Sequence, residues 1–299
     1  MSEGGVSEGG VRNGRLGNGR LGNGQLGNGQ LGNSGLSNSG LGRTGLSRVG
    51  QVALSFLGVV ALWYLAIYIR VPFGGVPLPN FILPSPARVA ETLWASRALL
   101  AEHSVTTLLE IVLGILLGVG FGMLTAFGFV AWPWLRRQGQ PVMVISQAIP
   151  VFALAPLLTL WFGYGIWSKI VMTTLIIYFP VTVAFFDGLR RTDRNLLDMA
   201  RVMGATRLRR LWLIRAPAAL PALGSGLKLA AVYAPIGAVI GEWVGASRGL
   251  GYLMLLANGR AKTDLMFAAV IVLACLAVAL YFTVSAIAAR LARWQPETG

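Results

Sequence analysis

The sequence predicts an all-α membrane protein with about six transmembrane helices and a disordered N-terminal tail. Of its 299 residues, 55% are hydrophobic and only 12% are charged, and the mean hydropathy is +0.66. Soluble domains carry about 25% charged residues, so this composition is typical of a chain that exposes much of its surface to lipid. The charged residues lie in short segments between long apolar runs, as expected of a polytopic membrane protein.

The charge and the rare residue types exclude several classes of function. The formal net charge is +14, but the basic residues flank apolar spans instead of forming one surface, which argues against a nucleic-acid partner. The single cysteine, Cys275, lies in an apolar run, so we expect neither a disulfide framework nor a cysteine metal site. With one histidine, His103, and scattered carboxylates, we expect no metal site and no catalytic centre.

Residues 1–48 are of low complexity and form a separate region ahead of a membrane domain at 49–299. From Asn13 a five-residue unit repeats, with a leucine at every fifth position. A period of five matches neither a helix nor a strand, and so few apolar groups cannot offset the entropy of ordering. We expect a disordered tail, which is not a signal peptide because it has no apolar core.

Six apolar segments are long enough to cross a hydrocarbon layer of about 30 Å at about 1.5 Å per helical residue. They are expected at residues 52–69, 105–130, 141–164, 169–186, 221–244 and 265–288. Ahead of the second span, Ser85 and Pro86 are typical of a helix start and predict a short amphipathic helix over 85–100. Residues 245–264 are too polar to span and predict a re-entrant or outer surface loop with a short helix.

Glycine and proline predict local features of two spans. Gly114, Gly118 and Gly122 recur every four residues in the second span, so one face of that helix permits close contact with another helix. Pro150 and Pro156 fall within the third span, where we expect a kinked or irregular helix.

The distribution of basic residues predicts the orientation. With both termini and the segment 187–220 in the cytoplasm, 18 of the 25 Lys and Arg residues lie on the inner side. The positive-inside rule favours this arrangement over its inverse. We therefore expect a multi-pass protein with both termini cytoplasmic.

The segment 187–220 is the internal stretch built for water or for a protein partner. We expect one helix over 196–203, capped by Asp193, and a second over 207–216, capped by Thr206 and stopped by Pro217. Gly204 between them suits the left-handed conformation that ends a helix. The alternative is an ordinary basic inner loop, which does not need two capped helices. The charged residues are Arg190, Arg191, Arg194, Arg201, Arg207, Arg209, Arg210 and Arg215 against Asp187, Asp193 and Asp198.

This segment resembles the EAA loop of ABC-importer permeases, whose pattern is Glu-Ala-Ala, three residues, Gly, nine residues, Ile, one residue, Leu-Pro. Here nine residues separate Gly204 from Ile214, and Pro217 falls in register. Three positions depart from the pattern: Asp198 stands for Glu, Met199 for Ala and Ala216 for Leu.

The resemblance covers residues 100–290 and implies a type I ABC-importer permease fold, present as a homodimer in the bacterial inner membrane. It implies that the segment docks on ATPase subunits at the cytoplasmic side and that a periplasmic substrate-binding protein delivers the solute. The residues implied in coupling are Asp198, Ala200, Gly204, Ile214 and Pro217. The chain has no Gly-x-x-x-x-Gly-Lys-Ser/Thr phosphate loop, so we expect the partner to bind and hydrolyse ATP, and this chain to have no cofactor and no enzymatic activity.

Polar and aromatic residues near the spans are candidates for the solute pathway. Charge inside a membrane is costly, so Glu242 and Glu110 are candidates by default. We expect Gln147, Trp161 and Tyr164 as further pathway residues, although aromatic residues in spans more often pack or mark the interface.

Each acidic candidate also has a structural alternative. Glu242 could be a helix-end carboxylate that pairs with Arg248 or faces water. Glu110 is expected at the membrane interface, Asp187 in the segment 187–220, and His103 at the outer interface.

A narrower resemblance concerns the solute. The stretches SQAIPVFALAPLLTLWFGYG, FPVTVAFFDGLRRTD and GAVIGEWVGASRGLGYLMLLANGRAKTDLMFAA are similar to permeases for hydroxymethylpyrimidine-type thiamine precursors. These belong to a branch that includes alkanesulfonate, taurine and nitrate importers, which is the alternative. From other classes, a secondary carrier would need buried ionisable relays and inverted repeats, and a membrane scaffold would not need the patterned segment.

Overall fold

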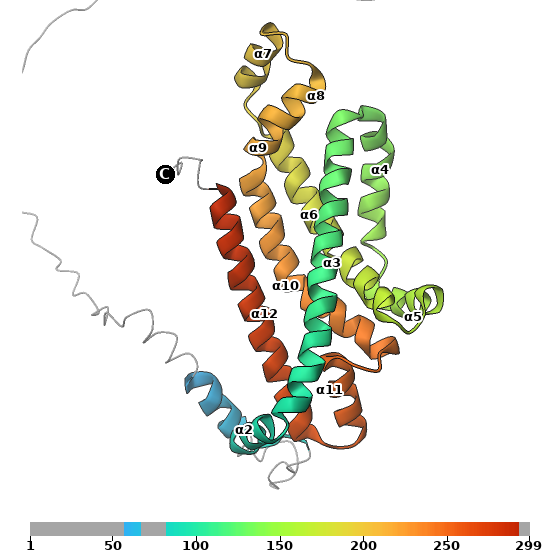
Figure 1. Ribbon diagram of the computed structural model, residues 1–299, viewed down its shortest axis with the longest axis vertical. Helices are drawn as coiled ribbons and strands as arrows, with labels where there is room; N and C mark the ends of the chain where they lie inside the picture. Colours follow the sequence, from blue (N-terminus) through green and yellow to red (C-terminus); the bar gives the residue numbers. More distant parts are fainter. Residues whose placement is uncertain (1–56, 67–81, 293–299) are drawn as a thin grey trace, which may run out of the picture. The chain divides into compact units, whose positions relative to one another are not determined.

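The computed structural model describes residues 57–66 and 82–292, which form helices joined by turns, with no strand among them (Figure 1). The repeat region predicted to be disordered lies outside the described residues. The first predicted span, 52–69, is described only over the helix Leu57–Ala66. The other helices are α2 (Pro86–Ala95), α3 (Arg97–Ala131), α4 (Pro133–Ser146), α5 (Val151–Phe162), α6 (Ile166–Arg190), α7 (Arg194–Val202), α8 (Arg207–Arg210), η2 (Leu211–Arg215), α9 (Ala216–Ala218), α10 (Leu220–Gly245), α11 (Leu250–Gly259) and α12 (Thr263–Ala292).

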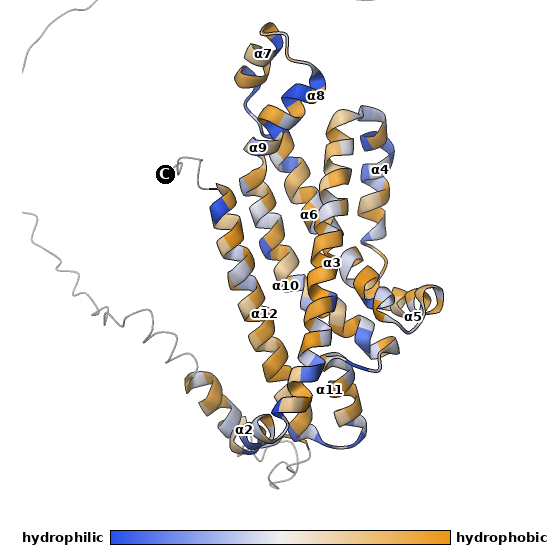
Figure 2. Cartoon of the chain, viewed as in Figure 1, coloured by the Kyte–Doolittle hydropathy of each residue, from blue (hydrophilic) through white to orange (hydrophobic). Residues whose placement is uncertain are grey.

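Four described helices are long and apolar enough to cross a membrane: α3, α6, α10 and α12. Figure 2 shows their apolar colouring against the polar ends. The pair α4 and α5 adds a fifth span if both are counted as one, although they are bent by 101°. The all-α membrane architecture is thus confirmed. The predicted spans 169–186, 221–244 and 265–288 lie inside α6, α10 and α12, and α11 is the short helix expected within 245–264.

Three boundaries differ from the prediction. The amphipathic helix starts as expected, with Ser85 accepting the Arg88 N–H, but it ends at Ala95. After Ser96 a new helix, α3, begins at Arg97 instead of 105, because the amphipathic and spanning segments take different directions. The third span is not one kinked helix from 141: α4 starts at Pro133 and stops at Ser146, and Pro150 precedes α5. Prolines restrict the preceding residue to extended backbone, which favours a full break over a bend.

The glycine face of α3 packs against α6, as the four-residue spacing predicted. A Cβ added at Gly114 would lie 2.5 Å from the Cγ2 atom of Thr173, and one at Gly122 would lie 3.0 Å from Val181. Gly237 of α10 approaches the same threonine from the other side, with its added Cβ 2.8 Å from the Thr173 Cα atom. Thr173 is fully buried, so α3, α6 and α10 pack closely together at this residue.

We expect Gly114→Ala to lower the free energy of unfolding by about 1–3 kcal/mol, the usual cost of an extra methyl in a packed core. Thermal unfolding of the purified protein measures it. Gly120→Ala, on the same helix with nothing within 4 Å of an added Cβ, is the matched control and is expected to be neutral or slightly stabilising. Equal behaviour of the two variants would contradict this account of the α3–α6 contact.

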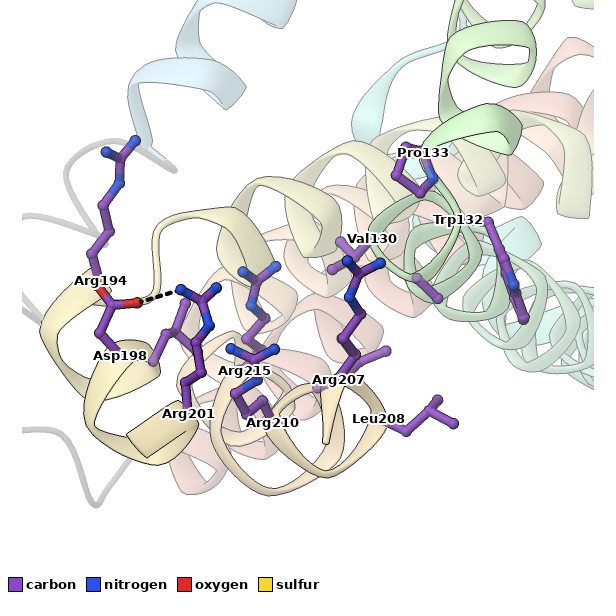
Figure 3. Close-up of a pocket in the computed structure, with 13 residues that line it drawn as sticks. Val130, Trp132, Pro133, Arg194, Asp198, Arg201, Arg207, Leu208, Arg210 and Arg215 are labelled. Atoms are coloured by element: carbon purple, nitrogen blue, oxygen red, sulfur yellow. Dashed lines mark hydrogen bonds and ion pairs between the residues drawn. The ribbon is translucent and has the colours of Figure 1, made fainter. Parts of the chain in front are cut away.

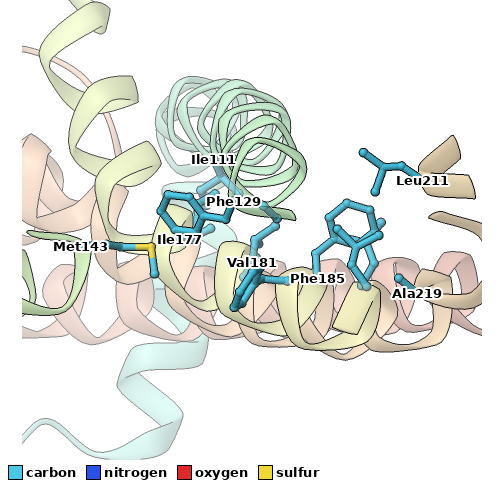
Figure 4. Packing of buried hydrophobic residues seen from close by; sticks show 14 of the residues in the cluster. Ile111, Phe129, Met143, Ile177, Val181, Phe185, Leu211 and Ala219 are labelled. Atoms are coloured by element: carbon cyan, nitrogen blue, oxygen red, sulfur yellow. The ribbon is translucent and has the colours of Figure 1, made fainter. Parts of the chain in front are cut away.

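The main apolar core joins this bundle to the segment between α6 and α10 (Figure 4). Ile177, Val181 and Phe185 of α6 are fully buried, and the cluster continues through Leu211 and Ala219. The rings of Phe127 of α3 and Trp212 of η2 are also in contact, with their centroids 4.5 Å apart and their planes tilted by 34°. The segment that follows α6 is therefore packed on the bundle along part of its length.

Candidate functional site

The segment between α6 and α10 contains two capped helical turns. Asp193 caps α7 by accepting the Asn195 N–H at 2.9 Å. Gly204 ends it with φ +80°, in the left-handed region that favours glycine. Thr206 then caps α8 by accepting the Arg209 N–H at 3.3 Å. Both predicted caps and the predicted glycine conformation are confirmed, although α7 begins at Arg194 instead of 196.

The prediction that Pro217 stops the second helix is wrong. The helical path continues from α8 through the π-turn η2 and α9, and Pro217 lies within α9. Proline cannot donate to the carbonyl four residues earlier, and its ring crowds that carbonyl. The wider π-turn just before it absorbs this misfit, and Ile214 lies in that turn.

The exposed part of α7 is apolar on one side. Met199, Val202 and Met203 are exposed at 58%, 89% and 79%, whereas Ala200 is buried beneath them. Asp198 forms an exposed ion pair with Arg201 at 3.2 Å, the kind that contributes about 0–1 kcal/mol. The five residues implied in coupling thus lie in one ordered segment, and their roles stay predictions.

A cluster of buried polar side chains lies where α11 begins. It is at the ends of α3, α6 and α10 that are farthest from α7 and α8. Glu242 is 1% exposed. Its carboxylate accepts the Thr107 hydroxyl at 2.6 Å and the backbone N–H groups of Gly251 and Tyr252. The alternative in which Glu242 pairs with Arg248 or faces water is wrong. Glu242 is buried, and the Nη1 atom of Arg248 lies 3.7 Å from the Oε1 atom of Glu102 instead.

The first N–H groups of α11 are all capped by side chains of other helices. His103 Nδ1 accepts the Gly249 N–H at 2.9 Å, and Thr107 Oγ1 accepts the Leu250 N–H at 2.8 Å. α11 has no side-chain cap of its own, so α3 and α10 supply what its sequence lacks. The His103 side chain is buried within the protein, and its place at the outer interface stays a prediction.

Glu110 is also buried within the protein, at 2% exposure, and its expected place at the membrane interface stays a prediction. Its carboxyl group lies close enough to that of Glu242 for the two to interact electrostatically. The Oε2 atom of Glu110 is buried with no partner among the described residues.

Lys169 is the residue that sequence reasoning missed. It is 2% exposed, and its ammonium group donates to the backbone carbonyls of Tyr164, Gly165 and Gly245 at 2.7, 2.9 and 2.5 Å. It joins the turn before α6 to the end of α10. Its only signal in the sequence is a lysine at the start of an apolar run.

The side chains of the remaining pathway candidates are exposed, although the backbone carbonyl of Tyr164 accepts a hydrogen bond from Lys169. Trp161 and Tyr164 are exposed at 70% and 78%, and Gln147 is exposed where α4 ends. Asp187 is half-buried inside α6, which corrects its placement in the following segment. The pathway roles of Glu242, Glu110, Gln147, Trp161 and Tyr164 stay predictions.

Comparison with known proteins identifies the family. Residues 118–295 match the model of the binding-protein-dependent transport system inner membrane component, which is more than half of the chain. The chain belongs to this family of ABC transporter permeases. It is therefore a non-catalytic membrane subunit of a transport system, and the ATPase is a separate protein.

Three curated relatives of this permease cover most of its length. A probable ABC transporter permease of Haemophilus influenzae is 54% identical over 69% of this chain and 84% of its own. The riboflavin transport system permease RibX of Chloroflexus aurantiacus is 38% identical over 73% and 82%. The formylaminopyrimidine transport permease ThiX of Halalkalibacterium halodurans is 37% identical over 68% and 78%.

A solved structure confirms the fold of the permease. The inward-facing MetNI methionine ABC transporter includes a chain that matches with a TM-score of 0.54 at 21% identity, over 67% of this chain and 98% of its own. At this identity the likeness shows the type I importer fold alone.

Proposed function

We propose that this permease forms the translocation pathway of an ATP-driven importer, works as a homodimer, and couples to ATPase subunits through α7 and α8. The observation that carries the coupling role is the exposed apolar face of Met199, Val202 and Met203 on a helix with a fixed cap at each end. An exposed apolar patch is typical of an interaction site, and a rigid helix that moves with a bound partner can transmit this displacement. The contact between Trp212 and Phe127 would transmit the displacement to α3.

We propose that the solute contains a pyrimidine ring, with a hydroxymethylpyrimidine-type thiamine precursor as the first candidate. Support comes from the relatives whose names specify formylaminopyrimidine and riboflavin, since both molecules contain such a ring. Riboflavin is the second candidate because RibX is as similar as ThiX. A sulfonate, taurine or nitrate is the alternative.

Titration of the cognate periplasmic binding protein with each compound tests the solute, since that protein selects the solute in such systems. We expect tight binding of an aminopyrimidine, or of riboflavin if the second candidate holds. Binding of taurine or an alkanesulfonate but of neither ring compound would refute the proposal.

Uptake into vesicles that hold the permease and its ATPase, with the binding protein added outside, separates an importer from a secondary carrier. We expect uptake to require ATP inside the vesicles and to persist when a protonophore collapses the proton gradient. Uptake without ATP that stops with the protonophore would favour a secondary carrier instead, with the buried carboxyl groups of Glu110 and Glu242 as candidates for proton transfer.

A further inference from the structure

A pocket of about 730 Å³ lies between the α3–α4 turn and the segment from α7 to η2 (Figure 3). Its size is in the range of small-ligand sites. Its apolar lining residues include Val130 and Pro133 from the α3–α4 turn and Leu197 and Leu211 from the other segment. Its basic lining residues are Arg194, Arg201, Arg207, Arg210 and Arg215.

The positive charge of this pocket is not balanced by the protein. Asp198 is the acidic residue that lines it, and its carboxylate already pairs with Arg201. The other four arginines form no ion pair within the part of the chain that the structure describes. Water screens the charges of the exposed Arg194, Arg201 and Arg207, so the repulsion is strongest between the half-buried Arg210 and Arg215.

Arg210 and Arg215 are the most constrained of the four. The Nε atom of Arg210 is buried and has no acceptor among the described residues. Burial, and then the charge of Arg210, lower the pKa of the Arg215 guanidinium below its ordinary value. An oxyanion between the two would accept the unsatisfied N–H group and relieve the repulsion.

The pocket lies where a membrane surface is expected. Trp132 is part of its lining at the end of the apolar helix α3, and Trp132 and Trp134 are exposed at 62% and 72%. Tryptophan is enriched at the level of lipid headgroups. With this end in the cytoplasm, as the distribution of basic residues predicts, this level is the headgroup layer of the inner leaflet.

The pocket and the proposed ATPase contact use different faces of α7. Arg194, Leu197 and Arg201 recur at helical spacing and line the pocket. Met199, Val202 and Met203 form the exposed apolar face and do not line it. The pocket is also lined by Arg207, Leu208 and Arg210 of α8, so a docked partner leaves it available only if the partner uses the apolar face of α7.

We propose that this pocket binds the phosphate headgroup of an anionic phospholipid from the cytoplasmic leaflet. Guanidinium groups match phosphate oxygens in paired hydrogen bonds, and basic pockets at the cytoplasmic ends of membrane helices suit such headgroups. The apolar lining residues Val130, Pro133 and Leu211 would contact the glycerol and the start of the acyl chains. The inference rests on the proposed orientation, but not on the identity of the solute.

Native mass spectrometry of the full chain in detergent, titrated with phosphatidylglycerol or phosphatidylcholine, tests the proposal. We expect phosphatidylglycerol to bind with at least about tenfold preference, and Arg210→Gln with Arg215→Gln to remove that preference, since each lost charged hydrogen bond is worth about tenfold or more. The control is Arg191→Gln with Arg209→Gln, two exposed arginines outside the pocket with the same change in charge, and it should bind like the parent. Thermal unfolding of both double variants checks that they fold.

If the glutamine pair does not fold, Arg210→Lys with Arg215→Lys keeps the charge and removes the paired geometry, and we expect intermediate binding. Equal losses of phosphatidylglycerol binding in the pocket and control variants would overturn the proposal, because they would show only nonspecific electrostatic attraction. Inorganic phosphate that displaces the lipid at equal concentration would show a free-anion site. Loss of bound lipid on adding the ATPase subunit would assign the pocket to acidic residues of that partner. Because no transport is measured, none of these outcomes bears on the importer assignment.

Discussion

Gly204→Pro is expected to abolish ATP-driven uptake while membrane insertion is retained. Gly204 has φ +80°, which proline cannot adopt because its ring holds φ near about −65°. Its N–H also donates to the Arg201 carbonyl at 3.0 Å, and proline has no such donor. The joint between α7 and α8 must therefore change direction, and the exposed apolar face of α7 would point elsewhere.

Gly204→Asn is the control for this prediction. Nothing lies within 4 Å of an added Cβ at this position, and asparagine tolerates the left-handed conformation, so uptake should remain near that of the parent. The measurement is uptake in vesicles together with ATP hydrolysis by the assembled complex. A proline variant that still transports would remove the coupling role from this segment. An asparagine variant that fails would show that space, and not backbone conformation, is what Gly204 provides.

Glu242→Ala is expected to lower the free energy of unfolding by about 3 kcal/mol and to release α11 from the bundle. The substitution leaves the Gly251 and Tyr252 N–H groups and the Thr107 hydroxyl without an acceptor. Each buried donor that is left without an acceptor costs about 1–3 kcal/mol. Hydrogen exchange should rise first at the amides of residues 251 and 252.

Glu102→Gln is the matched control, because Glu102 is an exposed carboxylate that pairs with Arg248 at 3.7 Å at the same end of the bundle. Its effect should stay within about 0.5 kcal/mol. Glu242→Gln keeps one carbonyl acceptor and should fall between the two. Unchanged amide protection in Glu242→Ala would contradict the role of Glu242 as the cap of α11.

Local chemistry explains why much of the inner segment was predictable. The caps at Asp193 and Thr206 and the conformation of Gly204 depend on residues within a few positions of one another. The same holds for the four-residue glycine spacing of α3. The prediction that Pro217 ends the helix was wrong because a π-turn before a proline can relieve its steric misfit. Whether a π-turn forms depends on how Leu211 and Trp212 pack on the other helices.

The sequence by itself determined the all-α membrane class, three span positions, the capped segment and its resemblance to importer permeases. Only the tertiary structure decided where α3 begins, how α4 and α5 separate, and what surrounds Glu242. The bonds of Glu242 to Thr107 and of Lys169 to Gly245 join positions 135 and 76 residues apart. Periodicity and capping report on neighbours along one helix, whereas a buried charge is stabilised by whichever distant groups the packing of helices brings to it.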